Sequence, residues 1–168
     1  MFQGMFRERR RSTAVRGTGL LHTPAEPGFD RYVDAAAGAF NAPFALLSLI
    51  YDQRQWFKAK HGMEIDCIDR DQGFCNFALD RPGLLEACDP EHDPRFSTLP
   101  VVAGSPHVRY YIGAPLRLLS GIDVGALCVL DTVHREPASA DQKAYLLGLA
   151  RQASMALEAR LDLMGDAA

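Results

Sequence analysis

The sequence predicts an α+β domain in which helices cover one face of an antiparallel sheet. Three observations carry this prediction. A helical pattern precedes an apolar run of strand length near residue 44, two further strand-like runs lie close together after residue 108, and a long amphipathic pattern ends the chain. Helices and strands that come in runs, rather than in strict alternation, are typical of this fold class.

Composition fits one globular domain and excludes several classes of partner. The 168 residues are 48% apolar and 23% charged, which is ordinary for a domain with a real core. A formal net charge of -3 gives no field for a polyanion, so we predict no nucleic-acid partner. No apolar stretch approaches 18 residues, so neither a membrane span nor a membrane partner is expected.

The cysteines and histidines indicate a reduced compartment and no metal. Neither a paired zinc spacing nor a secreted disulfide framework matches the four cysteines, so we predict free thiols and a cytoplasmic location. The five histidines are scattered, without metal-ligand spacing, and no cofactor is assigned. The residues concerned are Cys67, Cys75, Cys88 and Cys128, with His22, His61, His92, His107 and His134.

The chain is expected to begin with a flexible segment, residues 1–28. Glycines and prolines between residues 17 and 27 break any period, and the arginines of residues 7–11 are typical of a solvated tail. The domain proper is predicted over residues 29–164, followed by a short C-terminal tail, 165–168.

The first ordered elements are predicted as a helix and a strand. Apolar residues recur at three-and-four spacing from Phe29 to Phe40, which indicates a helix with one buried face. Asn41 and Pro43 end it. Phe44 to Tyr51 is a continuous apolar run, which is typical of a central strand buried on both faces.

The middle of the chain combines a second strand with an irregular region. Gln55 to His61 alternates as a strand does, with Trp56 on one face and Phe57 on the other. Residues 63–104 are irregular around two short apolar islands, 74–79 and 84–88. Because loops on a rigid scaffold carry binding residues, most of the function is expected there.

The second half predicts a strand pair and a long helix. Val108–Leu118 and Val124–Asp131 are joined by a turn at Gly121, and Pro115 requires a sheet edge or a bulge. The helix predicted over Ser139–Met164 begins with a capping-box pattern. Its apolar stripe is wider than one sheet face needs, which favours a second contact surface.

Several blocks of the sequence resemble bacterial GAF domains of the kind found with histidine kinases and diguanylate cyclases. Their common order and spacing carry the resemblance, at residues 29–31, 45–50, 55–58, 74–75, 93–96, 109–116 and 125–131. It implies a central antiparallel sheet with the N- and C-terminal helices packed on one face and a loop-roofed pocket on the other. It also implies a small-molecule ligand, a homodimer through the terminal helices, and a kinase or cyclase as signalling partner.

Departures from the family pattern bear on the ligand. The subgroup usually has a serine before its Phe-Cys pair and a histidine two places after the cysteine, whereas this chain has Gly73 and Phe77. We therefore expect a more apolar pocket. The motifs of bilin-binding and cyclic-nucleotide-binding GAF domains are not found, so the ligand stays unnamed.

Strand alternation selects part of a candidate pocket. Arg109 and Tyr111 share one face of their strand, and a pocket tolerates a charge and a hydroxyl better than a helix-packed face does. Arg109 either forms an ion pair with Asp131 at the end of the neighbouring strand or grips a ligand anion.

The other candidate pocket residues are Phe57, Cys75, Phe77 and His107. Phe57 and Phe77 either line the pocket or fill the core, and His107 lies either at the pocket mouth or on the surface. Cys75 either packs in the core or senses oxidants through its thiol.

The function predicted from these observations is that of a non-catalytic sensor. Two alternatives remain at this point: a cysteine-dependent enzyme resembling free methionine-R-sulfoxide reductase, with Cys75 or Cys88 as nucleophile, and an interaction module whose pocket is filled by its own side chains.

Overall fold

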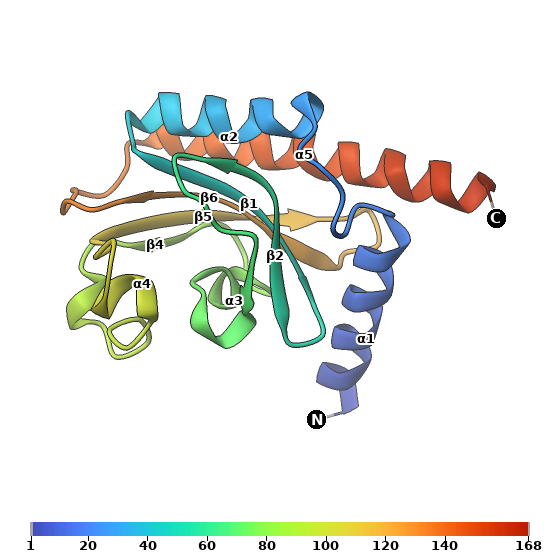
Figure 1. Cartoon of the computed structure of the whole chain (residues 1–168), viewed down its shortest axis with the longest axis horizontal. Coiled ribbons are helices and arrows are strands. Elements are labelled where there is room, and N and C mark those ends of the chain that lie inside the picture. Colours follow the sequence, from blue (N-terminus) through green and yellow to red (C-terminus); the bar gives the residue numbers. More distant parts are fainter. Residues whose placement is uncertain (1, 168) are drawn as a thin grey trace.

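The computed structural model describes residues 2–167 and contains one six-stranded antiparallel sheet (Figure 1). The strand order is β3-β2-β1-β6-β5-β4, so β1 and β6 form the centre. The strands are β1 (Phe44–Tyr51), β2 (Arg54–His61), β3 (Cys67–Asp69), β4 (Leu85–Ala87), β5 (Tyr110–Arg117) and β6 (Asp123–Asp131). The predicted fold class is confirmed.

The helices α2 (Pro27–Phe40) and α5 (Ala140–Ala167) lie side by side across one face of the sheet (Figure 1). Alternate strand residues point to this face and form the helix-side core, which includes Leu47, Tyr110 and Leu127. The opposite face packs against the segment between β2 and β5 and forms the loop-side core, which includes Leu46 and Tyr111. Both faces of β1 and β6 are therefore buried, as continuous apolar runs predict.

Local sequence signals explain where these helices begin and end. Pro27 opens α2, and Asn41 ends it in the left-handed conformation at φ 46°, which asparagine tolerates better than most residues. At the start of α5, the Ser139 hydroxyl accepts from the Gln142 amide at 3.1 Å, and the Gln142 side chain accepts from the Ser139 amide at 3.0 Å. This is the predicted capping box. The helix continues to Ala167, so residues 165–167 belong to α5 and not to a tail, and residue 168 lies outside the described residues.

A bulge in β2 breaks the strict alternation expected there. Phe57 pairs with Ser48 and Ala59 pairs with Leu47, so Lys58 is the extra residue. Ala59 consequently joins the helix-side core, while Phe57 stays in the loop-side core. Pro115 lies beyond the last pairing of β4 with β5, so its missing N–H leaves no ladder bond unmade.

The N-terminal segment is a helix, α1 (Phe2–Gly17), where the sequence predicted a flexible tail. It packs against β1, β6 and α5. The Arg11 side chain is fully buried: its Nε donates to the Asp123 carbonyl at 2.6 Å, and its terminal nitrogen donates to both Asp80 carboxylate oxygens at 2.8 and 2.7 Å. The prediction was wrong because the helix depends on these distant partners and not on an apolar stripe of its own.

The middle of the chain folds into short elements. The predicted apolar islands become α3 (Cys75–Ala78) and β4, and α4 (Pro100–Ala103) follows. Short 3₁₀ helices occur at Arg70–Gln72 and Pro90–His92. Within residues 2–167, no helix combines the length and apolar character that crossing a membrane demands.

Candidate functional site

A small cavity lies between the loop-side face of the sheet and the segment that follows β2. Its volume is about 30 Å³. A single water needs about 10–15 Å³ measured in this way, so the cavity holds two or three water-sized groups. The walls are mostly apolar and come from β1, β2, β5, β6 and α3, with Leu46, Phe57, Phe74, Tyr111 and Cys128 among them.

The side chain of Gln55 brings an unpaired acceptor to this cavity. Gln55 is 2% exposed, and its Oε1 has no hydrogen-bond partner within the described residues. Gly73 makes this position possible, because a Cβ at residue 73 would clash with Gln55 Oε1. Leaving a buried acceptor unpaired costs about 1–3 kcal/mol, so a donor inside the cavity would be held there.

Two thiols from different elements meet at the cavity wall. The Sγ atoms of Cys75, at the start of α3, and Cys128, in β6, are 3.9 Å apart. The Tyr111 hydroxyl donates to Cys75 Sγ at 3.3 Å, and the Tyr111 ring stacks on Phe74 with centroids 4.6 Å apart. Cys128 is held by strand pairing on both sides, because β6 is central to the sheet.

The two thiols differ in acidity. Hydrogen bonding with the Cys128 thiol has the largest influence on Cys75 and, with further hydrogen bonds from Ser48, Tyr111 and Gln55, lowers the pKa of Cys75 to about 7 against the effect of burial. Burial raises the pKa of Cys128 well above its ordinary value. Cys75 is therefore the thiol that ionises more readily.

Three of the predicted pocket residues line the cavity: Phe57, Cys75 and Tyr111. The other four lie outside it. Phe77 packs edge-on against Phe96 with centroids 5.2 Å apart, and His107 is exposed in the loop before β5.

The predicted Arg109–Asp131 ion pair is not formed. Arg109 Nε lies 2.7 Å from Glu91 Oε2, and only the backbone of residue 109 bonds to the Asp131 carbonyl. The Asp131 carboxylate is bound instead by Arg135, at 2.7 Å. The pairing of β5 with β6 brings the backbones of residues 109 and 131 together, but each side chain forms its ion pair with a residue in a loop. The order of residues in the sequence does not reveal which loop residue lies close to which strand residue.

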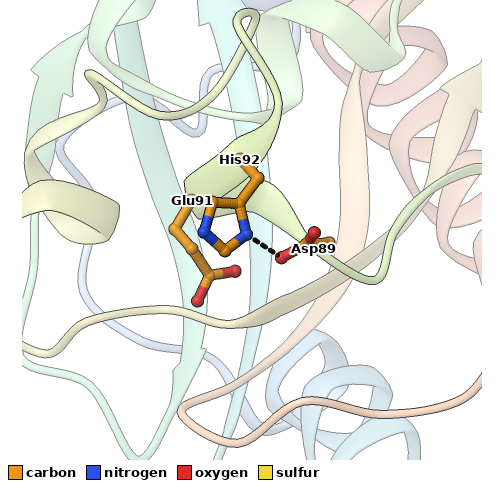
Figure 2. A group of neighbouring side chains, drawn as sticks. All are labelled: Asp89, Glu91 and His92. Carbon is orange, nitrogen blue, oxygen red and sulfur yellow. Dashed lines mark hydrogen bonds and ion pairs between the residues drawn. The ribbon is translucent and has the colours of Figure 1, made fainter.

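Figure 2 shows a cluster of Asp89, Glu91 and His92 whose potential ligand atoms lie within 4.8 Å of one another. His92 Nδ1 is 2.8 Å from Asp89, and His134 Nε2 is 2.8 Å from Glu91. Desolvation is the largest single influence and opposes ionisation of Glu91, but the hydrogen bonds from His134 and Asp89, a backbone hydrogen bond and the charge of His134 together outweigh it and lower the pKa of Glu91 to about 2. Since Glu91 is bound by Arg109 as well, the cluster is explained as an ion-pair network that ties this loop to the strand ends.

The sequence alone did not identify Gln55 and Cys128 as cavity residues, nor did it show that Gly73 leaves room for the Gln55 side chain. Cys128 lies in a continuous apolar run, which is typical of a core thiol, and Gln55 stands in an ordinary polar position before Trp56. The departure at Gly73 was the available signal, because a missing side chain beside a candidate pocket leaves room for another group.

A family comparison identifies the fold described above. The GAF domain model matches residues 24–157. The chain belongs to the GAF domain family. The match begins shortly before α2 and ends within α5, so it contains the whole sheet and the cavity.

A cyclic di-GMP phosphodiesterase from Pseudomonas aeruginosa is 39% identical to this GAF domain over 144 residues. The alignment covers 86% of the chain but 24% of the relative. The chain thus spans about a quarter of the length of that protein, so the similarity concerns one part of it.

Solved structures agree on the fold at low sequence identity. The GAF domain of an Acinetobacter phosphoenolpyruvate-protein phosphotransferase matches with a TM-score of 0.66 at 16% identity, covering 92% of this chain and 95% of that one. A type II free methionine-R-sulfoxide reductase from Thermoplasma acidophilum matches with a TM-score of 0.63 at 14% identity, covering 77% and 89%. At these identities the likeness shows the fold alone.

Proposed function

We propose that this GAF domain is a non-catalytic, cytoplasmic regulatory module. It binds a small molecule in the loop-side cavity and controls a signalling output of the kinase, cyclase or cyclic di-GMP phosphodiesterase type. The 39% identity to a quarter of a cyclic di-GMP phosphodiesterase supports this kind of output. The likeness to a free methionine-R-sulfoxide reductase, at 14% identity, shows the fold alone and does not carry that enzymatic activity over to this chain.

The unpaired Gln55 Oε1 in a covered cavity is the observation that carries ligand binding. A ligand that donates an N–H or O–H there gains a hydrogen bond that the empty protein lacks. The volume of about 30 Å³ limits the ligand to a few non-hydrogen atoms in this conformation. A larger ligand requires the segment over the cavity, which includes the half-buried Met63 and Ile65, to move outward.

Native mass spectrometry of freshly purified protein tests this proposal. We expect a small mass that is present under gentle conditions and lost on denaturation, and that is absent from a Gln55→Leu variant. A Gln55→Glu variant, which keeps acceptor oxygens at nearly the same size, is the matched control for side-chain shape. If neither the wild type nor any mixture with candidate small molecules shows an adduct, the filled-pocket interaction module replaces the sensor.

We also propose a homodimer through α5. At a rise of about 1.5 Å per residue, the 28 residues of α5 extend past the end of the sheet, as Figure 1 shows. Along its outer side, Ala144, Gly148, Gln152, Met155 and Ala159 follow one another at helical spacing, and Met155 is 67% exposed. A Cβ added at Gly148 would meet no other atom within 4 Å, so packing within the chain does not explain this glycine.

A second α5 packed closely against this stripe would explain the glycine at position 148, since glycine otherwise destabilises a helix by about 1 kcal/mol relative to alanine. We expect Gly148→Leu to dissociate the dimer and Gly148→Ala to weaken it to a smaller extent, since each places a Cβ where the second helix packs closely. Light scattering over a range of protein concentrations measures both. A wild type that stays monomeric at every concentration, or a Gly148→Leu dimer as tight as wild type, contradicts this interface.

A further inference from the structure

Cys75 and Cys128 offer chemistry that reversible ligand binding does not use. They line the same cavity from two different elements, a four-residue helix and a central strand, and both are at most 2% exposed. Their Sγ atoms are 3.9 Å apart. A disulfide requires about 2.05 Å, so the two sulfurs need to approach by roughly 2 Å.

We propose that Cys75 and Cys128 are a peroxide-reactive dithiol, in which a small hydroperoxide that enters the cavity oxidises Cys75 and Cys128 then closes a disulfide. This goes beyond the proposed function, because it is a covalent modification of the chain and does not depend on a reversible ligand or on the dimer.

The cavity admits an oxidant of this size to the thiols. Its rim includes the exposed Gln72 and the half-buried Met63 and Ile65, so the space reaches toward solvent. Hydrogen peroxide has two heavy atoms and fits about 30 Å³, whereas glutathione disulfide and other bulky oxidants do not. The unpaired Gln55 Oε1 lines the same space and can accept a hydrogen bond from a peroxide O–H.

The surroundings assign the roles of the two sulfurs. Tyr111 donates its hydroxyl hydrogen to Cys75 Sγ, which stabilises negative charge on that sulfur. The lowered pKa of Cys75 and the raised pKa of Cys128 agree with Cys75 as the attacking thiolate and Cys128 as the resolving thiol. The approach of the two sulfurs requires α3 to move, because Cys128 is fixed by strand pairing on both sides of β6.

The reaction balances with hydrogen peroxide as the oxidant. The Cys75 sulfur attacks one peroxide oxygen, an S–O bond forms and the O–O bond breaks, and the departing hydroxide takes the proton released by Cys75 to give water. The Cys128 sulfur then attacks the Cys75 sulfur, an S–S bond forms and the S–O bond breaks. The second hydroxide takes the Cys128 proton, so two thiols and one peroxide yield one disulfide and two waters.

Alkylation followed by mass spectrometry tests the proposal on the wild-type chain. Protein treated with hydrogen peroxide is quenched, denatured, alkylated and digested. We expect a Cys75–Cys128 cross-linked peptide, and the loss of both cysteines from the alkylated pool. Cumene hydroperoxide, which exceeds the cavity, is expected to form the cross-link more slowly at the same concentration.

A Cys67→Ser/Cys88→Ser variant removes the two half-buried thiols and leaves the pair alone. Its intact mass should fall by two hydrogen atoms after peroxide treatment, and this loss should vanish in a variant that also carries Cys128→Ala. Far-UV circular dichroism checks that each variant is folded. The proposal is overturned if Cys75 and Cys128 both remain alkylatable after peroxide treatment of folded protein, or if Cys75 accumulates as sulfinic acid while Cys128 stays free.

Discussion

Arg11 is the residue on which the attachment of the N-terminal helix depends. Its guanidinium is fully buried and bonded to Glu8, Asp80 and the Asp123 carbonyl, so it joins α1 to the loop after α3 and to the start of β6. A buried cation is tolerated only when its donors are satisfied, and here three separate acceptors do so.

Replacing Arg11 by methionine should lower the free energy of unfolding. Removing one partner of a fully buried ion pair costs about 3–5 kcal/mol, and we expect about 2–3 kcal/mol here because the abandoned carboxylates keep some contact with water. Asp80 is 29% exposed and Glu8 is 43% exposed. Urea unfolding measures the change, with the exposed neighbour Arg10→Met as control, which should remain within about 0.5 kcal/mol of wild type.

Glu91 gives the protein a specific response to acid. Its pKa is lowered to about 2 from an ordinary value of 4.5, so ionised Glu91 stabilises the fold fully above about pH 4.5, and this contribution disappears as the pH falls toward 2. Urea unfolding between about pH 6 and pH 2.5 should show a steeper loss of stability in wild type than in Glu91→Gln. If the free energy of unfolding falls equally with pH in the two proteins, Glu91 does not account for the acid sensitivity.

At the scale of elements, α5 begins with a capping box whose residues lie close together in the sequence. The reciprocal Ser139–Gln142 hydrogen bonds satisfy two amides that the helix itself cannot. Such a signal is contained within four residues, which is why it was predictable from sequence, whereas the bulge at Lys58 depends on the register with β1 and was not.

Ser139→Ala should destabilise the protein by about 1 kcal/mol, because the first turn of α5 loses its cap. Ser139→Asp keeps an acceptor oxygen at the same place and should retain most of the stability. Thermal unfolding distinguishes the two variants. Equal melting temperatures for Ser139→Ala and wild type would mean that the contacts of α5 with the sheet alone fix the start of the helix.

For the whole molecule, the sequence predicted the element order and the two faces of the sheet, but less of the candidate site. Phe44–Tyr51 and the β5–β6 pair were predictable because their periodicity is local. The meeting of Cys75 with Cys128 and the pairing of Arg109 with Glu91 are tertiary contacts, set by how loops of unpredictable conformation pack. The N-terminal helix was missed for the same reason.

The contacts of α1 indicate that the folded domain begins before residue 19. A chain that begins at Gly19 keeps the whole family match but loses Arg11 and Val15, and Val15 is fully buried in the helix-side core. We expect this shortened protein to unfold at a lower temperature than Arg11→Met. Hydrogen exchange should be faster in β1 and β6, which α1 contacts. If its stability matches that of the longer chain, α1 is an appendage and the domain begins near residue 29.

Because β1 pairs directly with β6, the register of the central strands is independent of the segment that forms the roof of the cavity. Residues 44–49 are bonded directly to residues 125–130, so the centre of the sheet closes without any contribution from residues 62–109. Lengthening a flexible loop twofold adds only about 0.6 kcal/mol of closure entropy. Mutation and insertion can therefore alter the part of the cavity lining that residues 62–109 supply, while the register of the central strands stays unchanged.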